Sequence, residues 1–256
     1  MANYEKFTEQ EIPFGILERF GLTQEMVEDL PQSIMQKLLS SRWTPVLPII
    51  TEDDNEEKHK AYARIKLVRK TDGTVDVCFA PYCGFDKLGS YSDDEQDRLR
   101  DGQVIIADVM AKDGTTQKSY VQFDKETNQT MYVPVLVIQQ NISIMADRMG
   151  FDYTDRDKLQ NCEVLEITGK NDVASVGIDL YDPAGIRVAD GDRNLWLSEA
   201  QQSEILPKYN IGIYGCWLAD ETGTMSYVLE EDYTEDILQE INRKGLQNAT
   251  NAHMRR

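Results

Sequence analysis

Three tight-turn signals divide much of this chain into short strand pairs. Asp72-Gly73, Asp113-Gly114 and Thr222-Gly223 each separate two runs rich in β-branched and aromatic residues. Glycine reaches the positive φ angles that a tight hairpin turn needs, so each signal favours two strands that return on themselves. The predicted hairpins cover residues 61–80, 103–123 and 211–229.

The first forty residues predict three short helices. Pro13 suits the first turn of a helix over residues 13–20. Thr23 can cap a second helix, and Pro31 opens a third. In the third helix the apolar residues recur at the spacing of one buried face: Ile34, Met35, Leu38 and Leu39. A helix-turn-helix DNA reader is the alternative, and the excess of acidic residues in this region disfavours it.

A helix followed by a hairpin occurs at least twice. Ser92, with Glu95 three residues later, has the pattern of a capping box, and its helix precedes the 103–123 hairpin. Ser198 opens a similar helix before the 211–229 hairpin. A helix and a hairpin cannot bury their apolar faces alone, so such units should pack together. The sequence therefore predicts an α+β protein with short N-terminal helices followed by repeated helix plus antiparallel β-hairpin units.

Weaker signs extend this repeat along the chain. Ser119-Tyr120-Val121 and Ser226-Tyr227-Val228 are 107 residues apart and occupy corresponding places in the two clear copies. Fainter copies begin near Ser33 and Thr154. The last part of the chain carries a helix over Tyr233–Lys244, which is followed by a frayed tail. We expect three parts: a helical plus β-hairpin domain, a helix-hairpin module and a C-terminal α+β region with a possible repeat, over residues 1–85, 86–140 and 141–256.

Acidic residues outnumber basic ones along the chain. There are 45 acidic and 27 basic side chains, which give a formal net charge of −18. General DNA coating and attraction to anionic lipid both need a positive surface, so this charge disfavours them. The acidic excess has two interpretations: solubility, or mimicry of nucleic acid by carboxylates that occupy a DNA-binding partner.

One basic segment contrasts with this acidic background. No acidic residue interrupts it, and its cations are Lys58, Lys60, Arg64, Lys66, Arg69 and Lys70. In a strand, Arg64 and Lys66 share one face, while Ile65 and Leu67 share the other. The segment is either the charged outer side of a half-exposed sheet or a site for a phosphate or an acidic partner. These six residues are the candidate binding residues of the chain.

Reactive side chains do not form a recognisable catalytic pattern. The only histidines are His59, in a charged loop, and His253, near the C-terminus, and neither position is typical of a rigid catalytic site. The cysteines form no Cys-x-x-Cys pair and are expected to be structural: Cys78, Cys83, Cys162 and Cys216. Nucleotide-binding glycine motifs are absent from the sequence. We therefore expect no catalytic residue, no structural metal and no cofactor.

A loop rich in aspartate gives the one alternative that involves a metal. Asp182, Asp190 and Asp192 could supply oxygen ligands to Ca²⁺ or Mg²⁺. The loop lacks the glutamate at position twelve of an EF-hand, and aspartates of this kind also satisfy backbone groups in turns. A metal-dependent enzyme that uses carboxylates near Asp182–Asp192 remains an open alternative.

Several short stretches in the first third of the chain resemble one protein family. They are Ile12-Pro13-Phe14, Phe20-Gly21-Leu22, Leu30-Pro31-Gln32-Ser33, Leu38-Leu39-Ser40-Ser41-Arg42, Thr44-Pro45-Val46-Leu47-Pro48 and Ala61-Tyr62-Ala63-Arg64-Ile65-Lys66-Leu67. Over residues 10–83 the chain is similar to a bacterial domain family of unknown function found in proteins of conjugative transposons and other mobile elements. Tyr91–Glu95 and Tyr120–Asn128 resemble its usual companion module, also of unknown function, over residues 85–135. The resemblance implies no catalytic residues.

Together these observations favour a protein that acts through its surface. We expect a non-enzymatic macromolecular binding or adaptor protein of a bacterial mobile genetic element, located in the cytoplasm. A protein is the expected partner, nucleic acid is disfavoured by the net charge, and no apolar run is long enough for a membrane partner. The alternatives are an acidic inhibitor that mimics DNA and the metal-dependent enzyme above. The oligomeric state stays open.

Overall fold

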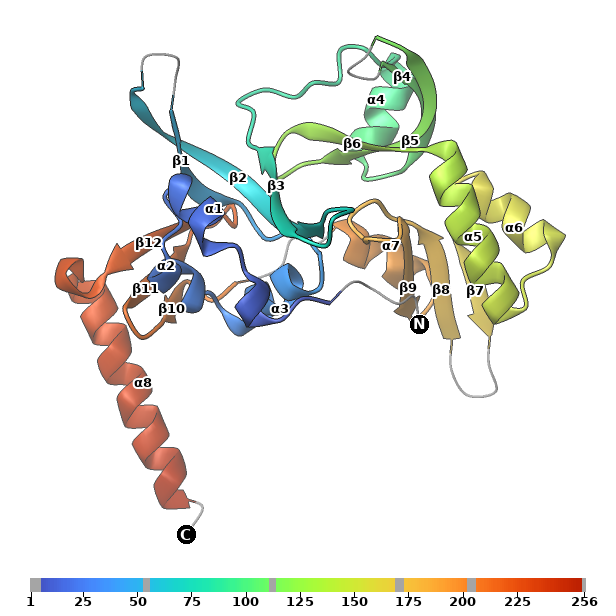
Figure 1. Cartoon of the computed structure of the whole chain (residues 1–256). Helices are drawn as coiled ribbons and strands as arrows, with labels where there is room; N and C mark the ends of the chain where they lie inside the picture. The colour runs from blue at the N-terminus through green and yellow to red at the C-terminus, as the bar shows by residue number, and fades with distance from the viewer. Residues whose placement is uncertain (1–5, 53–55, 111–113, 169–172, 202–205, 255–256) are drawn as a thin grey trace. The chain divides into compact units, whose positions relative to one another are not determined.

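The computed structural model describes residues 6–52, 56–110, 114–168, 173–201 and 206–254 (Figure 1). These residues form eight α-helices and twelve strands. The strands make four three-stranded antiparallel sheets, and in each sheet they pair in chain order. The predicted α+β class, with short N-terminal helices followed by repeated hairpin units, is confirmed.

A short helix precedes each of the four sheets. The first copy consists of α3 (Gln32–Leu39), β1 (Leu47–Glu52), β2 (Lys58–Arg69) and β3 (Val75–Pro81). The second consists of α4 (Asp93–Arg100), β4 (Ile105–Met110), β5 (Thr116–Asp124) and β6 (Gln129–Pro134). The third consists of α6 (Tyr153–Gln160), β7 (Leu165–Thr168), β8 (Val173–Ile178) and β9 (Ile186–Asp190). The fourth consists of α7 (Arg193–Gln201), β10 (Tyr209–Ile211), β11 (Gly215–Ala219) and β12 (Met225–Leu229).

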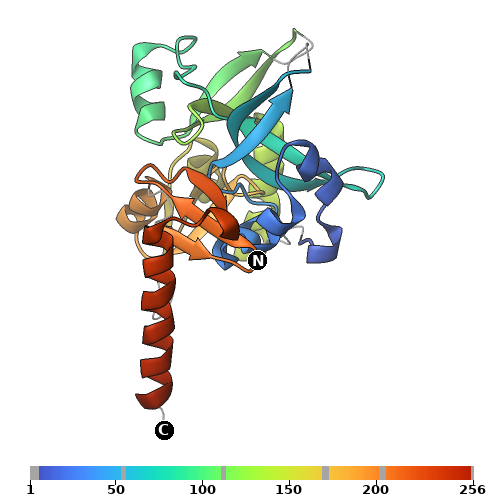
Figure 2. The same ribbon diagram turned by 90° about the vertical axis from the view of Figure 1, so that its left-hand side faces the viewer.

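Four further helices lie outside these copies in the sequence. They are α1 (Phe14–Arg19), α2 (Gln24–Glu28), α5 (Val135–Met149) and α8 (Glu235–Met254). The α8 helix follows β12 and runs past Gly245 as one continuous helix (Figure 2). The sequence predicts that this helix ends before Gly245 and that a frayed tail follows, and this prediction is wrong. A single glycine inside a helix costs only about 1 kcal/mol relative to alanine, which is too little to stop a helix by itself.

Local capping and turn signals form as the sequence predicts. The Thr23 side chain accepts a hydrogen bond from the backbone N–H of Met26. Ser92 and Glu95 form both halves of a capping box at the start of α4. Gly73 and Gly223 adopt φ angles of 86° and 82° in their hairpin turns. Residue-level signals therefore identify these boundaries correctly.

The fourth copy differs in detail from its prediction. Asp192 caps α7 by accepting a hydrogen bond of 2.9 Å from Leu195 N, so Ser198 lies inside the helix rather than at its start. The two Ser-Tyr-Val triplets also lie on different strands, because Tyr120 is on the middle strand β5 and Tyr227 is on the third strand β12. A glycine with positive φ occurs in the first hairpin of the second copy (Gly114) and in the second hairpin of the fourth (Gly223), so this signal does not distinguish a first hairpin from a second. Asp113 and residues 255–256 lie outside the described residues.

The chain folds as two compact units. The terminal unit consists of Phe7–Leu39, Trp43–Pro81 and Glu204–Arg256, and the central unit has Tyr82–Ser203 as its main segment. Segments from the first and the last third of the sequence therefore fold together in the terminal unit.

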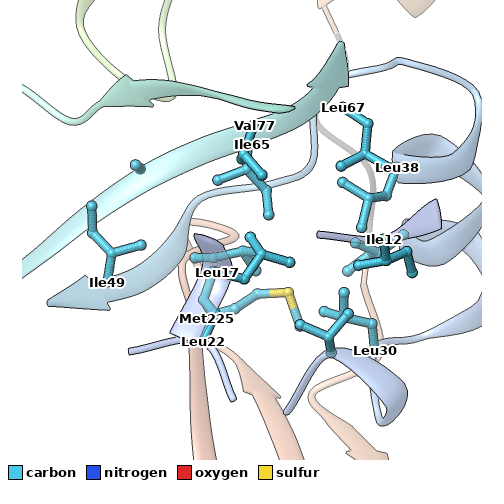
Figure 3. Close-up of a cluster of buried hydrophobic side chains, with 14 of the residues drawn as sticks. Ile12, Leu17, Leu22, Leu30, Leu38, Ile49, Ile65, Leu67, Val77 and Met225 are labelled. Carbon is cyan, nitrogen blue, oxygen red and sulfur yellow. The ribbon is translucent and has the colours of Figure 1, made fainter. Parts of the chain in front are cut away.

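The core of the terminal unit combines both ends of the sequence. Figure 3 shows Met225, from β12, pointing into a cluster formed by the N-terminal helices and by β1 to β3. Trp217, from β11, is fully buried in the same cluster, and its Nε1 donates a 2.9 Å hydrogen bond to the carbonyl oxygen of Met26. The backbone N–H of Met225 donates to the carbonyl oxygen of Val46, just before β1. Apolar burial and backbone pairing thus join the segments.

The central unit is built around the β4–β5–β6 sheet. Tyr120 and Val121 are neighbours in β5 and belong to different apolar clusters, because successive side chains point to opposite faces. On one face, α5 contributes Ile138, Ile142 and Ala146 to the larger cluster. On the other face, α4 contributes Leu99. Both faces of this middle strand are therefore covered within one contiguous segment.

Candidate macromolecule-binding surfaces

Strand β2 carries five of the six cations singled out in the sequence, and Lys70 directly follows it. The side chains of Ala63, Ile65 and Leu67 are fully buried on one face of the strand, as the alternation predicts. Lys58, Lys60, Arg64 and Lys66 alternate with them and share the opposite face. The sheet therefore places one apolar face in the core and a row of cations on the other face.

Arg64 serves an internal role on this face. Its side chain is buried, and its Nε donates a 2.6 Å hydrogen bond to the carbonyl oxygen of Thr44. The Thr44 hydroxyl oxygen in turn accepts a 3.0 Å hydrogen bond from the backbone N–H of Ile65. These contacts fix the segment that leads into β1.

Arg69 and Lys70 form ion pairs within the terminal unit. The Arg69 guanidinium lies 2.9 Å from Glu11 Oε1 and 5.0 Å from the centre of the Phe7 ring. Lys70 Nζ lies 2.7 Å from Asp76 Oδ2, and this hydrogen bond raises the pKa of the lysine and lowers the pKa of the aspartate. Both cations thus join β2 or its turn to neighbouring elements.

Lysines and aromatic rings alternate along the remaining part of the row. Lys66 is half-buried, with its ammonium 4.7 Å from the centre of the Trp43 ring, and burial lowers its pKa. Lys60 is exposed and lies 5.8 Å from the centre of the Tyr62 ring. Lys58 is also exposed, and its Nζ is 3.8 Å from Glu52. Lys58, Lys60 and Lys70 are therefore the solvent-exposed cations of the candidate site; Lys58 and Lys60 lie together at the start of β2, and Lys70 is held by Asp76.

A buried carboxylate, which the sequence analysis did not predict, holds the loop between β10 and β11. Asp29, directly after α2, accepts hydrogen bonds from the backbone N–H groups of Ile213, Tyr214 and Gly215 at 2.6–2.9 Å. It also accepts a 2.6 Å hydrogen bond from the Tyr227 hydroxyl. All four donors are neutral, and together they satisfy the charge of a side chain that lies inside the fold.

Two glycines allow the β10–β11 loop to approach this carboxylate. A Cβ atom at Gly212 would collide with the Asp29 carboxyl group, and a Cβ atom at Gly215 would collide with Tyr227. Burial and the hydrogen bond to Asp29 raise the pKa of the Tyr227 hydroxyl, so it stays protonated and donates at neutral pH. Two large apolar residues between closely spaced glycines are the only sequence signal for this loop.

Two of the three aspartates of the proposed metal loop, Asp182 and Asp192, accept local hydrogen bonds. Asp182 Oδ1 accepts a 3.0 Å hydrogen bond from Ala184 N, and Asp192 caps α7. Among the described residues, no three histidine, cysteine or carboxylate side chains converge as a metal site would require.

Two cysteines, Cys162 and Cys216, have raised pKa values that favour the thiol form. Burial raises the pKa of Cys162 to about 11 and also raises the pKa of Cys216. His59 is exposed on β2, and the side chain of His253 is outside the described part. Within the described ranges, no helix has the length and hydropathy needed to cross a lipid bilayer.

Comparison with known proteins identifies one domain. Residues 7–83 match the family described as "Protein of unknown function (DUF4099)", so a domain of this family is found there. The match covers the three N-terminal helices and the β1–β3 sheet. No curated protein and no solved structure is detectably similar to the chain.

Proposed function

We propose that this protein is a non-enzymatic binding or adaptor protein that recognises an acidic segment of a protein partner. The observation that carries the proposal is the exposed pair Lys58 and Lys60 on the outer face of β2, beside the ring of Tyr62. A lysine next to an aromatic ring offers a carboxylate both charge attraction and apolar contact. The proposal includes the mobile genetic element in which we expect this adaptor to act.

The arrangement of the six cations defines what this surface can do. Arg64, Arg69 and Lys70 make contacts that hold the terminal unit together. Substitution of the buried Arg64 would alter folding as well as binding, and Arg69 and Lys70 are already engaged by Glu11 and Asp76, so these three do not provide a clean test. Lys58 and Lys60 lie at the exposed end of the strand, where a change of charge leaves the core untouched.

A labelled peptide of twelve glutamates and aspartates tests the proposal, with a 20-base-pair DNA duplex as the competing probe. We expect the peptide to bind more weakly as salt rises, because the attraction between exposed charges is screened. The Lys58→Ala/Lys60→Ala variant should bind it roughly 5- to 10-fold more weakly, since each exposed ion pair contributes about 0.5–0.7 kcal/mol.

The matched control is Lys87→Ala/Lys125→Ala, which removes the same charge from exposed positions of the central unit. Equal losses in the two double variants would reject the β2 surface, and so would a failure to bind the peptide. Tighter binding to the duplex, lost in the β2 variant, would assign the surface to nucleic acid instead.

A further inference from the structure

Three large, exposed apolar residues have neighbouring backbones at one end of the β10–β11–β12 sheet. Ile213 is 79% exposed, Tyr214 is 43% exposed and Leu229 is 47% exposed. Leu229 pairs with Gly215 in the β11–β12 ladder, and the backbone N–H after it, of Glu230, donates to the carbonyl oxygen of Tyr214. We call Ile213, Tyr214 and Leu229 the apolar tip. Single exposed apolar residues are ordinary, but a gathered group marks a site of interaction.

The fold holds this tip in a fixed conformation. The backbone N–H groups of Ile213 and Tyr214 both donate to the Asp29 carboxylate, and the loop approaches so closely that a Cβ atom at Gly212 would collide with Asp29. Hydrogen bonds that hold the backbone inward leave these two side chains in solvent. A surface that is already ordered loses little conformational entropy when a partner binds.

The chain around the tip is strongly acidic. Residues 209–242 contain eight acidic residues and no lysine, arginine or histidine. Glu230, Glu231 and Asp232 directly follow Leu229, and all three are exposed. A partner that covers the apolar tip must therefore also bring positive charge to its rim, because an acidic partner would be repelled.

We propose that the apolar tip and its acidic rim form a docking site for a basic, leucine-bearing segment of a partner protein. The segment would place an apolar side chain on Ile213 and Tyr214 and its lysines or arginines beside Glu230 to Asp232. This site uses other residues than the Lys58–Lys60 surface and has the opposite charge. It therefore adds a second binding specificity to the adaptor.

The probe for this site is a labelled 18-residue amphipathic peptide of leucine and lysine, measured by fluorescence anisotropy. A peptide with glutamate in place of every lysine serves as the charge control. We expect the lysine peptide to bind more tightly than the glutamate peptide. Ile213→Ser should weaken its binding about 10- to 30-fold, because a well-buried aliphatic side chain contributes that much to an interface.

Control variants separate this site from general attraction to an acidic protein. Leu136→Ser changes a 76% exposed apolar residue of α5 and should leave binding unchanged. The triple neutralisation Glu230→Gln/Glu231→Gln/Asp232→Asn should weaken binding more than the same loss of charge on α4, by Asp93→Asn/Asp94→Asn/Asp97→Asn. Equal effects of the paired variants, or equal binding of the two peptides, would overturn the proposal.

Analytical ultracentrifugation of the chain alone tests whether the apolar tip instead binds a second copy of the chain. A dimer that Ile213→Ser dissociates would assign the tip to a second copy of the chain and would also overturn the proposal. A monomer that binds the lysine peptide through the tip would support it. None of these results depends on Lys58 or Lys60, so this site and the proposed function can fail separately.

Discussion

The two units of this protein differ in how far along the sequence their cores extend. The central unit draws its apolar clusters from the contiguous segment Tyr82–Ser203. The terminal unit needs Trp217 and Met225 to fill a core whose other members come from residues 7–77. Its buried carboxylate, Asp29, is also bound by groups 184–198 residues away. The apolar clusters of one unit therefore come from a single segment, whereas the core of the other needs strands from the last third of the chain.

This difference changes what the DUF4099 match means physically. The matched residues 7–83 supply the helices and the first sheet of the terminal unit but none of β10, β11 and β12. Without these strands, the apolar cluster loses a tryptophan and a methionine, and the Asp29 carboxylate loses its four hydrogen-bond donors. The family boundary thus lies inside a folding unit, whereas the central unit begins where the match ends.

The largest effect is expected when the units are separated. A fragment of residues 82–203 should unfold cooperatively, and a fragment of residues 7–83 should not. Loss of a buried Trp and a buried Met together costs roughly 5–10 kcal/mol, which is comparable with the whole stability of a small domain. Urea titration followed by far-ultraviolet circular dichroism measures both fragments.

The matched control for this prediction restores the missing strands. Residues 7–81 joined by a short flexible linker to residues 206–254 should recover a cooperative transition. A cooperative transition of the 7–83 fragment alone would show that the β10–β12 sheet is dispensable, and the contrast between the units would disappear.

A smaller effect is expected from the Asp29→Ala substitution in the intact chain. Three backbone N–H groups and the Tyr227 hydroxyl lose their acceptor, so we expect a loss of roughly 3–5 kcal/mol in the terminal unit. The counterpart in the central unit is Asp124, which is buried and accepts hydrogen bonds from Glu126 N, Thr127 Oγ1 and the Tyr181 hydroxyl. Asp124→Ala should destabilise the central unit instead.

Hydrogen exchange read by mass spectrometry distinguishes the two outcomes. Exchange should accelerate in β1–β3 and β10–β12 for Asp29→Ala, and in β4–β6 for Asp124→Ala. If either variant accelerated exchange equally in both sets of strands, the two units would be opening as one.

The sequence predicts those features that depend on neighbours in the chain. The capping residues Thr23 and Ser92 and the turn glycines Gly73 and Gly223 act within four residues, so local patterns identify them. Backbone conformation at these places is set by short-range sterics and hydrogen bonds.

Features that depend on distant partners were not predictable in the same way. Alternation places Arg64 on the outer face of β2, but its burial follows from a carbonyl group 20 residues earlier in the chain. Asp29 has an ordinary sequence context, and its role appears only when the β10–β11 loop closes around it. The short strands β7 and β10 were missed because three or four residues carry too little alternation to be recognised.

The smallest effect is a loss of stability at alkaline pH, which we expect in the central unit because it buries a thiol and a phenol. In the central unit, burial raises the pKa of Cys162 from 9.0 to about 11 and the pKa of Tyr120 from 10.0 to about 12. The folded state holds these protons more tightly than the unfolded chain does. The stability they contribute is therefore complete below pH 9 and falls as pH rises through the folded pKa values.

For Cys162 the shift of two pKa units corresponds to roughly 2–3 kcal/mol. Urea titration of the 82–203 fragment at pH 8, 9.5 and 11 should show this decline, and Cys162→Ala should flatten it. In the intact chain, Cys162→Ala should not change how the stability of the terminal unit depends on pH. Hydrogen exchange in β1–β3 measures that stability. An unchanged slope in the variant fragment would mean that the thiol titrates in the folded state as it does in water. The closed cluster around Tyr120 would then admit solvent, and the central unit would be less tightly packed than the terminal one.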